Sequence, residues 1–172
     1  MKNNFSKYQG LGNDFIIFDA RSNNLDHLFS KNKDNFIEHL CNRNFGIGAD
    51  GIILILESNN KCFVRMKIYN SDGSEPEMCG NGIRCLIAFL NDNNEINELS
   101  EIPIETKAGL ILTSIDGNEN IKVNMGEPIL SPLDIPTKLL MNSLKVPNGV
   151  ITLKDQILNV YAASMGNPHM IV

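Results

Sequence analysis

The run Met78-Cys79-Gly80-Asn81-Gly82-Ile83-Arg84-Cys85 constrains the fold more than any other part of this chain. Apolar residues recur at helical spacing from Ile83 to Leu90, so the run predicts a cysteine on a tight turn that leads into a helix over about 82–91. The first N–H groups of a helix lack an internal partner and carry partial positive charge. They can hold a carboxylate, and they can lower a thiol pKa from about 8.5 to roughly 3.5–7.5. Gly80 and Gly82 would leave the backbone open to a ligand.

Composition excludes several functional classes. The chain has 172 residues, enough for one domain or one and a part, and its net charge of -5 without a Lys/Arg cluster argues against a nucleic-acid surface. No apolar stretch approaches the roughly 20 residues of a membrane helix, and the N-terminus lacks a signal-peptide core. The four cysteines are too scattered for a disulfide framework. We expect a cytoplasmic protein, or a plastid stromal one whose targeting segment is not in this chain.

The rest of the chain predicts an α+β protein with short strands. We expect strands over 5–8, 15–18, 52–56, 63–69, 102–106, 110–115, 121–125, 149–153, 157–164 and 169–172, and a further helix over 33–43. Residues 126–137 carry three prolines and are typical of a connector, so we divide the chain into 1–125 and 126–172. The last residues form an apolar, strand-like run, and the second part is too short to bury its own core. We therefore expect a truncated second domain.

Each cysteine also has a structural interpretation. Cys41, Cys62 and Cys85 stand in apolar periodic contexts and are best interpreted as buried core residues. The Gly-Asn-Gly sequence that follows Cys79 makes this interpretation weaker there. The spacing of Cys79 and Cys85 fits no common zinc pattern, and no histidine lies nearby in the sequence, so we expect no metal.

Three further loops are candidates for ligand binding, although each alone is more typical of a simple turn. They are Gly10–Asp14, Gly46–Asp50 and Asn70–Gly73. The run from Gly46 completes neither a dinucleotide fingerprint nor a phosphate-binding loop, so we assign no nucleotide. Taken together, Asn side chains at such loops offer donors and acceptors for an α-amino acid. By composition alone, Met165–His169 is a turn into a strand.

Taken in order, these motifs resemble the diaminopimelate epimerase family. The resemblance rests on Gly10–Phe15, Gly46–Gly51, Tyr69–Ser74, Cys79–Cys85, Val123–Pro128 and Met165–His169, and it runs from about residue 5 to the last residue. It implies a pyridoxal-independent isomerase without a cofactor that interconverts LL- and meso-2,6-diaminopimelate in lysine and peptidoglycan-precursor synthesis. Two cysteines on opposite faces of the α-carbon would transfer the proton. The implied fold has two lobes, each a curved, mostly antiparallel sheet wrapped round a central helix.

The resemblance also assigns roles to single residues. Cys79 matches the catalytic cysteine of the first lobe. Asn167 matches a substrate contact of the second lobe, and His169 a residue that tunes the cysteine pKa values. The substrate-binding positions of the first lobe correspond to Asn13, Asn70, Gly80 and Asn81.

The family's second cysteine lies in a later Cys-Gly-[Ser/Thr]-Gly segment that these 172 residues do not contain. We therefore expect this chain to be inactive alone. Two alternatives stay open: a racemase of another amino acid on the same fold, and a half-module without catalysis. For partners we expect a small-molecule substrate, no nucleic acid and no membrane, with a homodimer through an exposed lobe face as the oligomer considered.

Overall fold

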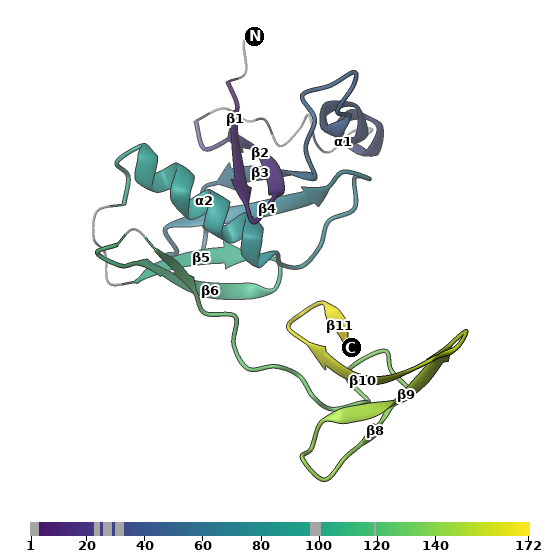
Figure 1. Ribbon diagram of the computed structural model, residues 1–172. Helices are drawn as coiled ribbons and strands as arrows, with labels where there is room; N and C mark the ends of the chain where they lie inside the picture. Colours follow the sequence, from purple (N-terminus) through teal and green to yellow (C-terminus); the bar gives the residue numbers. More distant parts are fainter. Residues whose placement is uncertain (1–3, 23–24, 26–28, 30–32, 97–100, 119) are drawn as a thin grey trace. The chain divides into compact units, whose positions relative to one another are not determined.

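The computed structural model describes residues 4–22, 25, 29, 33–96, 101–118 and 120–172. The chain divides into two compact units, Met1–Asn124 and Met125–Val172, and each is described by itself. Among the described residues, the first unit holds two α-helices and a seven-stranded sheet, whereas the second holds a four-stranded sheet (Figure 1).

The seven-stranded sheet keeps the order of the sequence, β1 to β7. Its β2–β3 and β4–β5 pairs are parallel and the other pairs are antiparallel. Parallel neighbours need a long crossover, and each of these two connections contains one of the helices. The elements are β1 (Ser6–Gly10), β2 (Asn13–Asp19), α1 (Lys33–Cys41), β3 (Gly51–Leu56), β4 (Val64–Asn70), α2 (Gly80–Asp92), β5 (Ile102–Thr106), β6 (Gly109–Ile115) and β7 (Ile121–Val123).

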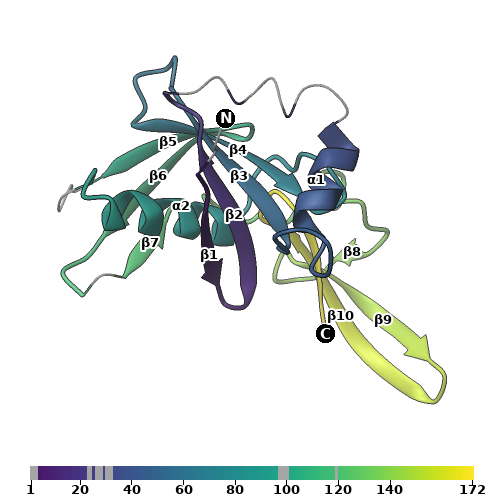
Figure 2. The same cartoon turned by 90° about the horizontal axis from the view of Figure 1, so that it is seen from above.

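The sheet curls around α2. Strands β1 and β7 are its two ends, yet both contact α2, as do β2, β3 and β4 between them. Figures 1 and 2 show α2 lying along one face of the sheet. The residues that α2 buries recur at helical spacing, as the sequence predicts: Gly82, Ile83, Cys85, Leu86, Ile87, Phe89 and Leu90. The curved α+β lobe with a central helix is confirmed.

Strand β3 is covered on both faces, which explains its unbroken apolar run Ile52–Leu56. Ile52 and Leu54 belong to a buried cluster with Ile37 of α1, on one face of the sheet. Ile53 points to the other face, where its Cδ1 lies 3.5 Å from the place a Cβ on Gly82 would occupy. Fully burying one such side chain stabilises the fold by about 1.5–3 kcal/mol.

The second unit is an antiparallel sheet of order β11-β10-β9-β8. It contains β8 (Leu140–Met141), β9 (Pro147–Leu153), β10 (Gln156–Ser164) and β11 (Pro168–Ile171), and no helix occurs among its residues, all but a few of which are exposed or half-buried. An isolated bridge between Ile129 and Ser164 ties the proline-containing connector to β10.

The predicted elements are found, with shifted ends. The helix expected over 33–43 ends at Cys41, and the strand expected over 121–125 ends at Val123. Strand β8 was not predicted, because two residues are too short to show an alternating pattern.

Candidate functional site

The predicted loops of the first unit lie together at one end of the strands of the seven-stranded sheet. Strand β2 runs parallel to β3, with Phe15 opposite Gly51, and β4 runs antiparallel to β3, with Asn70 opposite Gly51. The start of β2, the start of β3 and the end of β4 therefore lie at the same end of the sheet. Asn13 opens β2 and Asn70 closes β4. Loops that are far apart in the sequence thus meet at one side of the sheet.

Cys79 is the N-cap residue of α2, as the sequence predicts. Its backbone is extended (φ -145°, ψ 111°), and its carbonyl accepts the N–H of Ile83 at 2.9 Å. Its thiol makes no capping hydrogen bond, and the residue is half-buried. The thiol therefore stands where the helix begins, beside backbone N–H groups that carry partial positive charge. This arrangement suits a reactive sulfur next to a bound carboxylate.

The expected role of Gly82 in opening the backbone to a ligand is wrong. A Cβ at Gly82 would lie 2.9 Å from Cδ1 of Ile68 and 3.5 Å from Cδ1 of Ile53. Gly82 is buried against the sheet, so its lack of a side chain lets the first turn of α2 approach β3 and β4. Gly80 is half-buried at the first position of the helix.

The side chains of Asn13 and Asn81 contact each other. Nδ2 of Asn81 donates to Oδ1 of Asn13 at 3.3 Å, which joins the start of α2 to the start of β2. Nδ2 of Asn13 in turn donates to Oδ2 of Asp50 at 3.0 Å. At the other end, Nη2 of Arg84 donates to Oδ1 of Asn81. The structure thus brings together two of the predicted asparagines and adds two charged residues.

Asp14 and Asp50 form an ionic cluster beside Asn13. Nη2 of Arg43 lies 2.7 Å from Oδ1 of Asp14 and 2.8 Å from Oδ1 of Asp50, and Nζ of Lys7 lies 3.0 Å from Oδ2 of Asp14. The Arg43 hydrogen bond, with Lys7 adding to it, holds the pKa of Asp14 well below its usual range. Hydrogen bonds from the Asn13 side chain and the Asp14 backbone lower the pKa of Asp50. Both carboxylates are therefore charged at neutral pH.

Asn70 belongs to a separate, tightly turned loop. Its backbone N–H donates to the carbonyl of Ser74 at 2.8 Å, and its Nδ2 donates to Oγ of Ser74 at 2.9 Å. Gly73 adopts φ +80°, which favours glycine at this position of the turn. Ser71 N–H donates to the carbonyl of Asp50 at 3.0 Å, so this loop is attached to the one that carries Asp50.

Cys41 and Cys85 differ from Cys79 in burial, whereas Cys62 does not. Cys41 and Cys85 are buried, and burial is the main reason that the pKa of each thiol rises to about 11. The structural interpretation is confirmed for these two. It is wrong for Cys62, which is half-buried, with Sγ 3.8 Å from the carbonyl oxygen of Asn60.

Asn167 and His169 lie in the second unit. Asn167 is exposed in the turn before β11, where its carbonyl accepts the N–H of Met165 at 3.3 Å. His169 is exposed on β11, opposite Ala163 of β10, and lines a hollow of about 420 Å³. These two residues thus belong to a different unit from Cys79.

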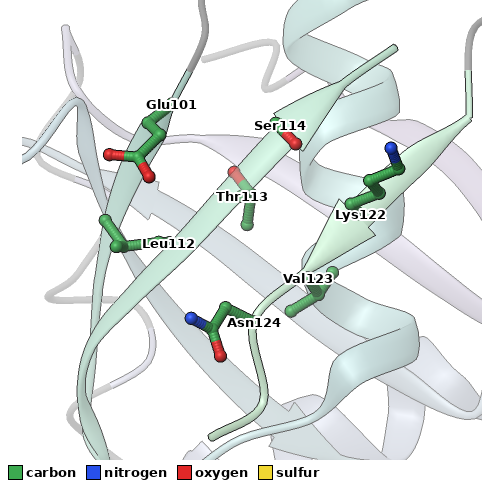
Figure 3. A pocket seen from close by; sticks show the side chains of 7 residues that line it. All are labelled: Glu101, Leu112, Thr113, Ser114, Lys122, Val123 and Asn124. Atoms are coloured by element: carbon green, nitrogen blue, oxygen red, sulfur yellow. The ribbon is translucent and has the colours of Figure 1, made fainter.

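A hollow of about 230 Å³ on the outer strands of the first unit lies apart from the predicted site (Figure 3). Thr113 and Lys122 are among its lining residues, and none of the predicted site residues lines it. Across the described parts of the chain, no group of three or more His, Cys, Asp or Glu could hold a metal ion. No helix in the described ranges is long and apolar enough to span a membrane.

Sequence reasoning missed the charged residues that hold the asparagines. Asp50 closes the Gly46–Asp50 loop, but nothing in the sequence pairs it with Asn13. Arg84 follows Asn81 by three residues on α2, a spacing that brings side chains together on a helix surface and could have indicated their contact.

Comparison with known proteins agrees with this architecture. The sequence model of the family described as diaminopimelate epimerase matches residues 5–131. A diaminopimelate epimerase of Prochlorococcus marinus (strain NATL2A) is 99% identical over all 172 residues, which cover 61% of that protein. The corresponding protein of strain MIT 9313 is 46% identical over 168 residues, covering 98% of this chain and 55% of that protein.

Among solved structures, a hydroxyproline epimerase from Agrobacterium vitis superposes with a TM-score of 0.63 at 14% identity, over 96% of this chain and 50% of that one. At this identity the likeness concerns the fold. The chain spans 61% of the length of its 99% identical relative. Because the family model matches well over half of the residues, the chain belongs to the diaminopimelate epimerase family.

Proposed function

We propose that this chain supplies one lobe of an isomerase that interconverts LL- and meso-2,6-diaminopimelate, with Cys79 as one of two proton-transfer groups. The observation that carries the proposal is the position of Cys79 at the N-terminus of α2, with Asn81 and Asn13 in contact beside it. Family membership and the near-identical relative support the choice of substrate.

The chemistry follows from this position. A Cys79 thiolate takes the α-proton, and the electron pair of the broken C–H bond moves toward the α-carboxylate. A second thiol on the opposite face then gives a proton to the same carbon, which forms the new C–H bond and inverts the centre. In the reverse direction the two sulfurs exchange roles. The reaction needs no oxidant and no cofactor.

The N-terminal amides of α2 would stabilise the negative charge as it develops on the carboxylate. In other enzymes the loss of one such donor costs roughly 2.7–4 kcal/mol of transition-state stabilisation. We propose that Gly80 contributes its backbone here, and that Asn13, Asn70 and Asn81 hold the polar groups of the amino acid. Asn167 would add a contact from the second unit, and His169 would tune the cysteines.

The second thiol is not expected among the other three cysteines of this chain. Cys41 and Cys85 are buried, with thiol pKa values of about 11, and Cys62 lies on a loop before β4. We therefore propose that these 172 residues alone do not catalyse the reaction. We propose that the protein acts in the cytoplasm as a homodimer. Its proposed partner is the small molecule diaminopimelate, and we propose no nucleic-acid or membrane partner.

The test is substrate choice by the 99% identical Prochlorococcus relative. The purified protein is incubated with LL-diaminopimelate, L-proline and trans-4-hydroxy-L-proline, and each product is separated on a chiral column. The proposal predicts conversion of diaminopimelate alone. Faster epimerisation of a proline would favour a racemase of another amino acid, and the absence of any turnover would favour a module without catalysis.

A further inference from the structure

The contacts of Asn13 and Asn81 form one continuous relay with a charge at each end. From one end to the other, Asp50 accepts from Asn13 at 3.0 Å, Asn13 accepts from Asn81 at 3.3 Å, and Asn81 accepts from Arg84. The relay crosses from the start of β3 to the start of β2 and then into the first turn of α2. It therefore couples three elements through side chains alone.

The two ends leave only one orientation for the amides between them. An ionised carboxylate only accepts hydrogen bonds and a guanidinium only donates them. Asn13 must therefore present its NH₂ group to Asp50, which leaves its oxygen for Asn81. Asn81 must then present its NH₂ group to Asn13 and its oxygen to Arg84. Rotating either amide by 180° would place two acceptors or two donors against each other.

Both ends of the relay have further neighbours, and Asp50 is held by additional hydrogen bonds. Asp50 also accepts from the backbone N–H of Asp14 at 3.1 Å and from Nη2 of Arg43 at 2.8 Å. At the other end, Arg84 lies beside β1, where its Nη2 is 3.4 Å from the place a Cβ on Gly10 would occupy, an ordinary van der Waals distance. Arg84 is half-buried, and a polar group in this position is costly to leave without a partner.

We infer that Asp50 and Arg84 are positioning residues that fix the amide orientations of Asn13 and Asn81 from opposite ends of this relay. The inference rests on the proposed function, in which both asparagines bind the amino acid. Each amide uses one N–H in the relay, so its second N–H is oriented in advance for an acceptor such as the substrate carboxylate. Without the charged ends, the amides would sample both orientations and would present an oxygen to the substrate part of the time.

The test uses the 99% identical Prochlorococcus relative, with substitutions at the matching positions. Arg84→Met removes the donor and keeps an unbranched side chain, and Arg84→Lys keeps a cationic donor. Asp50→Asn replaces a carboxylate that only accepts by an amide that can present either a donor or an acceptor to Asn13. Arg21→Met is the matched control, because Arg21 joins Asp19 to Glu95 at the far end of α2 without touching the relay. The readouts are kcat and KM for LL-diaminopimelate together with the melting temperature.

We expect Arg84→Met and Asp50→Asn each to lower kcat/KM at least tenfold well below the melting temperature, and Arg84→Lys to recover most of the loss. Arg21→Met should lower the melting temperature and leave kcat/KM within about twofold. A kcat/KM within twofold of the parent in both Arg84→Met and Asp50→Asn would overturn the inference. If Arg84→Met does not fold, the Asp50→Asn result decides alone.

A second readout does not depend on activity. In protein labelled with ¹⁵N-asparagine, the side-chain signals of Asn13 and Asn81 should shift or broaden in Arg84→Met and stay unchanged in Arg21→Met. Unchanged signals in Arg84→Met would overturn the relay. A parent protein that does not turn over diaminopimelate but shows these shifts would refute the proposed function and leave the relay standing.

Discussion

Gly46 gives the sharpest test of how the loop before β3 is held. A Cβ at this position would lie 1.9 Å from the carbonyl oxygen of His39, 2.7 Å from that of Leu40 and 3.0 Å from that of Asn42. All three are backbone atoms at the end of α1, so no side-chain rotation can relieve the clash. Gly46→Ala must therefore push the loop away from the helix.

The magnitude follows from the hydrogen bonds that this movement breaks. The N–H groups of residues 46–49 donate to carbonyls of Asn42, Leu40 and Cys41 at 2.9–3.1 Å. Losing about three of these bonds costs roughly 3 kcal/mol, at about 1 kcal/mol each. Alanine also reduces the conformational entropy of the unfolded chain, which stabilises the fold by about 0.5–1 kcal/mol. The net loss in the free energy of unfolding is therefore about 2 kcal/mol. For a chain of 172 residues that corresponds to a fall in melting temperature of roughly 4–8 °C, and for the longer relative, unfolding as one unit, to roughly 3–4 °C.

The assay is thermal unfolding of the 99% identical relative, with Gly117→Ala as the control. Nothing lies within 4 Å of a Cβ at Gly117, and its φ lies outside the left-handed region, so this variant should melt within about 1 °C of the parent. A melting temperature of Gly46→Ala equal to that of Gly117→Ala would refute the backbone clash at Gly46.

Three further predictions concern the same unit. Leu11 is 86% exposed and has φ 57°, a backbone conformation that asparagine tolerates better than leucine. Leu11→Asn should therefore raise the free energy of unfolding, measured in urea titrations, by about 0.5 kcal/mol. A free energy of unfolding below that of the parent would contradict backbone strain at Leu11. Because the pKa of Asp14 is lowered in the folded state, its ionised carboxylate stabilises the fold at pH values above about 3.9, the pKa of an unfolded aspartate. This stabilisation is lost as the pH falls from there toward the pKa of Asp14 in the folded state. Asp14→Asn should therefore lose less melting temperature than the parent between pH 6 and pH 3, and parallel losses would refute the ionic role. Because burial raises the thiol pKa of Cys41 and Cys85 to about 11, both should resist iodoacetamide at pH 8 until urea is added, as mass spectrometry can show; equal labelling rates with and without urea would be inconsistent with the burial.

Local features of this chain could be predicted because they depend on neighbouring residues. The helical spacing after Cys79 indicates α2 and its first turn, and the apolar run Ile52–Leu56 indicates the strand β3, whose burial on both faces the structure adds. The curl of the sheet around α2 came from the family resemblance, since no local pattern states which strands a helix touches.

The relay illustrates what the sequence could not provide. Asp50 and Asn13 are 37 positions apart, and their contact depends on the parallel register of β2 and β3. Gly82 was misinterpreted for a related reason: the Ile68 side chain that lies against the Cβ position there belongs to strand β4, whereas Gly82 lies in helix α2. Pairings that form only in the tertiary fold leave no signal in the spacing of residues.

Deuterium transfer to the α-carbon tests directly whether Cys79 moves the proton. The 99% identical relative is incubated with LL-diaminopimelate in D₂O, and the meso product is analysed by mass spectrometry for the parent, Cys79→Ala and Cys85→Ala at the matching positions. We expect deuterated meso product from the parent and from Cys85→Ala, and a rate at least about a hundredfold lower from Cys79→Ala. Deuterated product from Cys79→Ala at the parent rate would contradict the assignment of Cys79 as a proton-transfer group.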